Sequence, residues 1–209
     1  MKVVSEIVSV VLILALSLGL ISTVLMYGYP MIAKAQDKGA LERVISVFSP
    51  DIPNSISKRM EYVSKFGGST TINLEVNGVW EAVSFDDTSE MKNSLSYIFL
   101  SRVTNVNSDQ YISLSLGEKC PPENGIFGIN SPFVVCVKGE SSQTGFSIKY
   151  TVFARNLTSE DQVYFVKLKP VDGNRIQSTS KSIRIERSNI ETVYEGNKKV
   201  IIVTLEISL

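Results

Sequence analysis

The segment IVSVVLILALSLGLISTVLMYGYPMIA, residues 7–33, contains no charged side chain in 27 positions. As an α-helix it would be roughly 40 Å long, more than the roughly 30 Å hydrocarbon core of a bilayer. A single segment in lipid must satisfy its own backbone hydrogen bonds, so it must be helical. Tyr27 and Tyr29 stand near its C-terminal end, where aromatic side chains favour the membrane interface. The segment therefore predicts a membrane-spanning helix, which Pro30 is expected to kink or loosen.

Two other interpretations of this segment are a cleaved secretory signal and a buried core helix. A secretory signal has an apolar region of about 7–15 residues and a small-residue cleavage site. This segment is much longer, and the sequence from Tyr27 to Pro30 is a poor cleavage site. We therefore interpret residues 1–33 as a retained transmembrane or filament-core helix.

Residues 34–68 are expected to form a helical neck. Leu41, Val44, Ile45 and Phe48 follow the spacing of an amphipathic helix. The prolines at 50 and 53 should interrupt it, because the residue before a proline disfavours the helical conformation. Asn54 or Ser55 can cap a second short helix, with an apolar stripe at 56, 60, 63 and 66, which the glycines at 67 and 68 should end.

After residue 68 the period of the apolar residues changes to two, which is typical of strands. Residues 70–76 and 79–85 alternate on either side of Asn77-Gly78, the dipeptide that most strongly favours a two-residue hairpin turn. Residues 87–106 fit either a helix or a strand. Further strands are predicted at 111–116, 133–137, 146–154, 163–168, 181–186 and 200–207. The expected fold class is α+β, with a β-rich, antiparallel, sandwich-like (Ig-like) head over residues 69–209.

Composition excludes most common catalytic and metal sites. The chain has 21 Lys+Arg, 21 Asp+Glu, two Cys and no His. A net charge of zero removes the general electrostatic case for binding nucleic acid. The absence of histidine removes Ser-His-Asp and Cys-His catalysis and every His-ligated metal site. We expect no enzyme, cofactor or metal site. The carboxylate pairs at 86–87 and 160–161 are interpreted as solvated turn residues, and Trp80 as part of the core or of a sheet face.

Two features favour an extracellular head. Cys120 and Cys136 flank a loop-like stretch with two prolines, which suits a disulfide in an oxidising compartment, although two buried free thiols are the alternative. Asn156 begins an Asn-Leu-Thr glycosylation sequon. The charges that flank the apolar helix leave its orientation ambiguous.

Within the apolar helix, small residues are spaced for close helix contacts. Ala15 and Gly19 are four residues apart, and Ser5 and Ser9 repeat the spacing. Such pairs allow two helix backbones to approach closely, although they also occur by chance in apolar helices. Glu6 stands alone at the entrance of the helix, where the helix dipole favours a carboxylate.

The N-terminal sequence KVVSEIVSVVLIL, residues 2–14, resembles the N-terminus of archaeal type IV pilins and pilin-like proteins. The Ser-Glu-Ile element before the long apolar helix carries the match, and Tyr29-Pro30, Asp37 and Gly67-Gly68 are similar landmarks. The resemblance covers about the first 35 residues, and the head is matched only by its β-rich character. It implies that a prepilin peptidase removes a short positive leader, to which Lys2 would belong. Only Met1 and Lys2 precede Val3, which is a departure from the family pattern.

The resemblance further implies that many copies of the helix bundle into a filament core, where Glu6 pairs with the α-amino group of an adjacent subunit. The partners expected are therefore other copies of the chain or related pilins, with the membrane as host before assembly. The function expected is that of a major or minor structural subunit of a surface filament, assembled through Glu6, Ser9, Ala15 and Gly19. The alternative is a monotopic, membrane-anchored extracellular binding or scaffold domain that does not polymerise.

Overall fold

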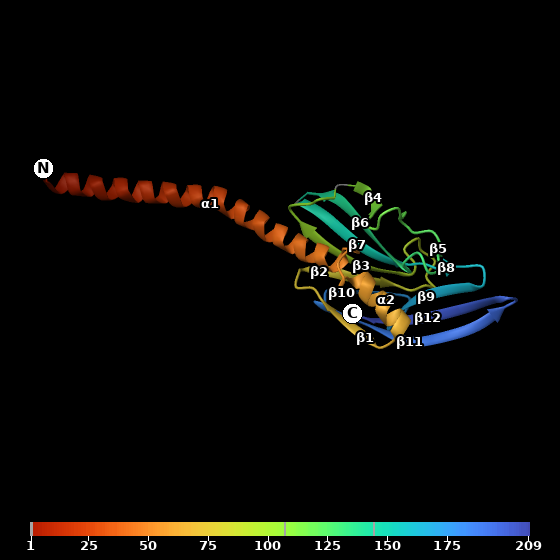
Figure 1. Cartoon of the computed structure of the whole chain (residues 1–209). Helices are drawn as coiled ribbons and strands as arrows, with labels where there is room; N and C mark the ends of the chain where they lie inside the picture. Colours follow the sequence, from red (N-terminus) through yellow and green to blue (C-terminus); the bar gives the residue numbers. More distant parts are fainter. Residues whose placement is uncertain (1, 107, 144) are drawn as a thin grey trace.

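A computed structural model describes residues 2–106, 108–143 and 145–209, with the backbone alone for residues 2–7. The first element, α1, runs from Lys2 to Phe48 as one helix of 47 residues. It extends away from the head, and Figure 1 shows it bending before it reaches the strands. Pro30 lies inside the helix and does not end it. The apolar segment and the first part of the neck are therefore one continuous element.

The second helix, α2 (Ile56–Phe66), follows the interruption that the two prolines predict. Ser55, one of the two expected caps, occupies the N-cap position with extended backbone. Gly67 ends the helix with φ of 83°, a left-handed conformation that favours glycine. A Cβ at Gly67 would also meet the Arg187 guanidinium. Both helices of the neck therefore form as expected.

The head consists of two facing β-sheets, as Figure 1 shows, and the expected α+β sandwich-like fold is confirmed. One sheet contains, in spatial order, β1 (Ser69–Asn73), β11 (Ser182–Glu195), β12 (Lys198–Ser208), β9 (Gln162–Pro170), β8 (Leu157–Thr158) and β5 (Gly125–Ile126). The other contains β10 (Arg175–Ser178), β2 (Gly78–Val83), β3 (Ser94–Ser101), β7 (Gly145–Ala154), β6 (Phe133–Ser142) and β4 (Ser108–Ser113).

The predicted hairpin at Asn77-Gly78 is wrong. β1 pairs with β11 and β2 pairs with β3, so the two strands belong to different sheets. The connection between them passes through the core, because Leu74 and Val76 are both buried. The Tyr97 hydroxyl donates a hydrogen bond of 2.6 Å to the Val76 carbonyl. Glycine is required at position 78 because the backbone there lies close to the Tyr97 ring, and not because of a turn. A Cβ at this position would lie 2.5 Å from the ring.

The other predicted strands are present, with two corrections. The ambiguous segment 87–106 contains the strand β3 rather than a helix. The head is not wholly antiparallel, because β9 pairs in parallel with β12 and β5 pairs in parallel with β8. β9 and β12 are separated along the chain by β10 and β11, and that length of chain permits a parallel crossover.

One hydrophobic core joins the helices to both sheets. Val44 and Phe48 of α1 and Met60 of α2 are completely buried. α2 contacts β6 of one sheet and β1, β11 and β12 of the other, so it lies along one side of the sandwich. The Asn93 carboxamide links the sheets from within: its Nδ2 donates to the carbonyls of Ala154 and Val166, at 3.1 and 2.8 Å.

Candidate functional site

The surface of α1 between Val8 and Ile32 is apolar and exposed. Leu16, Leu20 and Met26 are 66, 68 and 71% exposed. By length and composition the helix is able to cross a membrane, and none of its most apolar 18-residue window is buried in the protein. Exposed apolar surface of this extent needs lipid or another protein to cover it.

Two hydroxyl groups within this segment are satisfied by the helix itself. Ser17 Oγ donates to the Ile13 carbonyl and Thr23 Oγ1 donates to the Gly19 carbonyl, each at 2.8 Å. A hydroxyl without a partner is costly in an apolar medium. These two bonds therefore suit the segment to lipid or to a dry helix bundle.

The C-terminal part of α1 is fixed to the head. Ala33 and Leu41 are nearly buried, and Val44 and Phe48 are completely buried. Asp37 Oδ2 accepts a hydrogen bond of 2.9 Å from the backbone N–H of Arg102, just after β3. The apolar helix therefore meets the head at a packed junction.

The predicted assembly residues lie on the exposed part of this helix. Ser9, Ala15 and Gly19 are exposed. A Cβ added at Gly19 would meet nothing within 4 Å. Glu6 belongs to the helical backbone, but its side chain is outside the described residues. The structure of a single chain therefore leaves the Ala15–Gly19 face accessible to a partner helix.

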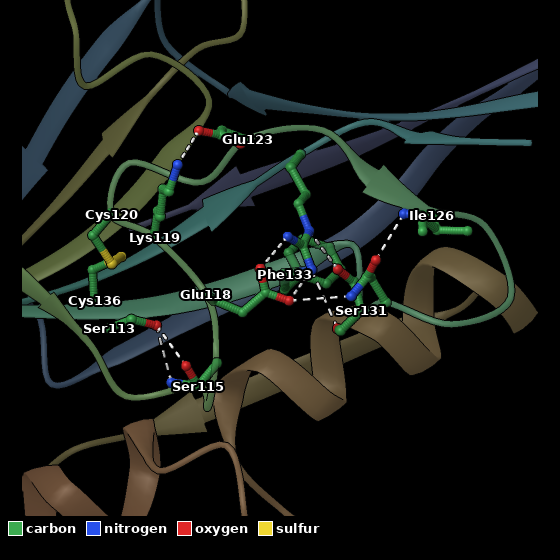
Figure 2. A network of polar contacts seen from close by, with 12 residues as sticks. Ser113, Ser115, Glu118, Lys119, Cys120, Glu123, Ile126, Ser131, Phe133 and Cys136 are labelled. Carbon is green, nitrogen blue, oxygen red and sulfur yellow. Dashed lines mark hydrogen bonds and ion pairs between the residues drawn. A yellow bond between two sulfur atoms is a disulfide. The ribbon is translucent and has the colours of Figure 1, made fainter.

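Cys120 and Cys136 form a disulfide, which attaches the loop before β5 to β6. Figure 2 shows it beside a polar network centred on Glu118. The Arg155 guanidinium binds Glu118 with both of its terminal nitrogens, at 2.5 and 2.7 Å, and donates through Nε to the Ser131 carbonyl at 2.9 Å. The hydrogen bonds from Arg155 lower the pKa of Glu118, while partial burial opposes them. The network orders the loop between the disulfide and β6.

Asn156, the first residue of the sequon, is half-buried in the connection between β7 and β8. Its backbone carbonyl accepts a hydrogen bond of 2.8 Å from Gly125. Its side chain lines a surface cleft together with Pro121 and Pro122. The predicted disulfide and sequon are therefore close in the fold.

Two features of the head had no signal in the sequence. Glu81, in β2, is 1% exposed. Lys149 Nζ lies 2.7 Å from Glu81 Oε2, while Arg175 and Gln177 bind Oε1. Burial alone would raise the pKa of Glu81, but these hydrogen bonds outweigh it and lower the pKa to about 2. The partners of Glu81 come from β7 and β10, which lie far from β2 in the sequence, so no local pattern indicated that its carboxylate is buried.

The second such feature is a cleft of about 500 Å³ beside α2. One wall is apolar and comes from four strands and the loop before β6. The opposite wall is the polar side of α2, where Lys65 Nζ lies 2.6 Å from Glu61 Oε1. Residues in the apolar wall are Phe127, Ile129, Leu157, Tyr164, Ile190 and Ile201. These residues are dispersed in the sequence, so no local pattern indicated the cleft.

Trp80 and the carboxylate pairs, which the sequence analysis interpreted as structural, occupy ordinary positions in the fold. Trp80 is completely buried, with its ring centroid 4.7 Å from that of Tyr97. Asp87 accepts a hydrogen bond from the Ser89 backbone in a turn, and Glu160 and Asp161 are exposed. Within the described ranges, no three His, Cys, Asp or Glu side chains are grouped to hold a metal ion.

Comparison with known proteins adds no relative: no family model, no curated protein and no solved structure matches the chain.

Proposed function

We propose that this protein is a structural subunit of an archaeal type IV pilus-type surface filament, assembled through its N-terminal helix. The observation that carries the proposal is α1, which is one element from an exposed apolar surface to the interior of a β-rich head. The resemblance of residues 2–14 to archaeal type IV pilins supports the same function.

The apolar helix must be covered both before and after assembly. In the membrane, lipid covers residues 8–32, and the head lies outside, where the Cys120–Cys136 disulfide suits an oxidising compartment. If the helix leaves the lipid, its apolar surface must be covered again. Identical helices from neighbouring subunits provide that cover, and the small residues at 15 and 19 let their backbones approach. The packed junction at Phe48 then holds each head at a fixed position relative to the bundle.

The competing function is a membrane-anchored extracellular domain that stays in the lipid. The two functions share the same topology and differ in whether the helix is extracted. Shearing cells that produce the protein, followed by mass spectrometry of its N-terminal peptide, separates them. We expect the chain in the sheared filament fraction with a processed N-terminus. A chain confined to the membrane fraction with Met1 intact would contradict the filament and favour the anchored domain.

A further inference from the structure

The strand β11 has a free edge over its second half. β1 pairs with β11 only from Ser182 to Glu186, and the last backbone contact on that side is the Arg187 N–H donating to the Gly68 carbonyl at 3.1 Å. Among the residues that the structure describes, no strand pairs with this edge beyond Arg187, although β12 pairs with the other edge as far as Glu195. Every residue from Ser188 to Glu195 is exposed. Unpaired N–H and C=O groups along such an edge can accept another strand.

The two faces of this free segment differ in chemistry. Ile190 pairs with the buried Val203, which places it on the inner face of the sheet, where it also lines the cleft beside α2. Glu191 and Glu195 lie on the outer face, because side chains alternate along a strand. Val193 lies between the two glutamates. The outer face of the free edge therefore carries two carboxylates, one on either side of Val193, and the inner face carries Ile190 and Tyr194.

We propose that Ser188–Glu195 binds an extended segment of a partner protein, one that alternates apolar and basic residues, by addition of a strand to β11. Backbone hydrogen bonds to β11 would hold the segment. Its apolar side chains would point to the inner face, toward Ile190 and the cleft, and its lysines or arginines would lie opposite Glu191 and Glu195. Eight residues of strand are roughly 26 Å long, which sets the length of the bound segment.

Charge complementarity selects the partner. The outer face of the free edge carries two carboxylates, and no ion pair to either is found within the described part of the chain, although Asn189 Nδ2 donates to Glu191 Oε1 at 2.7 Å. Lys198 faces Glu195 across the hairpin and partly offsets it. The proposal concerns the head alone and holds for a filament subunit and for an anchored domain.

The test uses the full chain in lipid nanodiscs and an acetylated, amidated octapeptide that alternates lysine and valine. Calorimetry gives the affinity, and amide hydrogen exchange shows where the peptide binds. We expect binding together with slower exchange in residues 188–195. A peptide that alternates glutamate and valine, and the lysine peptide methylated on every second backbone nitrogen, should each bind at least tenfold more weakly. Equal binding by either control peptide would overturn strand addition or charge selection.

Variants localise the effect. Glu191→Lys combined with Glu195→Lys should weaken the lysine peptide at least tenfold. Glu75→Lys combined with Glu90→Lys makes the same change of net charge at exposed positions elsewhere, and should leave the affinity within twofold. Ile129→Ser, in the apolar wall of the cleft, should weaken binding at least threefold. An equal loss of affinity in the two double Glu→Lys variants, or no loss of affinity in Ile129→Ser, would contradict the proposed site. Slow exchange in residues 188–195 without peptide, dependent on protein concentration, would assign the edge to a second copy instead.

Discussion

The ring of Phe48, the last residue of α1, lies 5.2 Å from the ring of Tyr150 in β7, centroid to centroid. Phe48 is also stacked on Trp80 and Tyr97, at 6.0 and 6.5 Å. The end of the apolar helix is therefore one wall of the aromatic core of the head. The helix and the head share their stability at this point.

Phe48→Ala should destabilise the head by about 3–5 kcal/mol, because it leaves a cavity among aromatic rings. The single tryptophan, Trp80, reports unfolding by its fluorescence in urea, with the full chain in detergent micelles. Phe66→Ala is the matched control, since Phe66 is 71% exposed. We expect it to cost much less than Phe48→Ala. Equal losses in the two variants would contradict a shared core.

Glu81 should make the head sensitive to acid. Its pKa is about 2 in the folded chain against an ordinary value of 4.5. A carboxyl with a lowered folded-state pKa stabilises the protein fully above the unfolded value, and loses that contribution as the pH falls from about 4.5 toward 2. The shift corresponds to roughly 3 kcal/mol. Urea unfolding between pH 7 and 2.5 should show this loss in the wild type and a smaller dependence in Glu81→Gln.

Gly19→Leu should reduce filaments without affecting the head. A side chain at Gly19 meets nothing within 4 Å in a single chain, so urea unfolding should be unchanged. At a close helix crossing, overpacking typically costs about 1–3 kcal/mol, and every subunit of a filament repeats it. Gly28→Leu is the control, because nine residues at 100° each place it on the opposite side of the helix. Normal filament yield with leucine at 19 in electron micrographs would remove this face from the contact.

Glu6→Gln should leave expression, membrane insertion and folding intact but sharply reduce surface filaments. In a bundle, the charge must be matched by a neighbouring α-amino group, since an unpaired buried charge costs several kcal/mol. In a simple anchor, the change removes only a few tenths of a kcal/mol of dipole interaction. Electron microscopy and a membrane-fraction blot read both effects, with Glu42→Gln at an exposed position of α1 as control. Wild-type filament numbers would exclude the pairing.

The disulfide should be present in native protein. Mass spectrometry after alkylation without reduction should find a peptide that joins Cys120 to Cys136, and two alkylated thiols would defeat the prediction. Replacing both cysteines by alanine should cost roughly 3 kcal/mol, because the bridge closes a loop of about 15 residues in the unfolded chain.

Sequence periodicity predicted the elements better than their pairing. The stretch from 133 to 137 is a short apolar run rich in valine, and the stretch from 200 to 207 alternates over its second half; both patterns indicate a strand regardless of its partner. The hairpin predicted at Asn77-Gly78 was wrong because burial of Leu74 and Val76 outweighs the local preference of this dipeptide for a turn. The parallel pairing of β9 with β12 depends on contacts between distant segments, which no local window contains.

The sequence likewise revealed some parts of the candidate site and not others. The apolar helix was visible as one uninterrupted run, and the cysteines as a pair around a loop. The cleft and the free edge of β11 were not visible in the sequence. Each depends on how strands that are distant in the sequence lie next to one another in the sheet. β1 begins only at Ser69, opposite Glu186, and that late start leaves Ser188–Glu195 without a neighbour on that side.

The unbroken helix also has a mechanical consequence. At 1.5 Å per residue, α1 is a strut about 70 Å long, and its last turn packs against β2, β3 and β7 of one sheet. Tension applied at the N-terminal end is therefore borne by side chains in shear, around Val44 and Phe48, with no slack linker to extend first. Torque on the helix likewise turns the whole head. Pro30 removes one backbone hydrogen bond from the helix, so we expect sideways load to bend the helix there while it stays stiff to pulling.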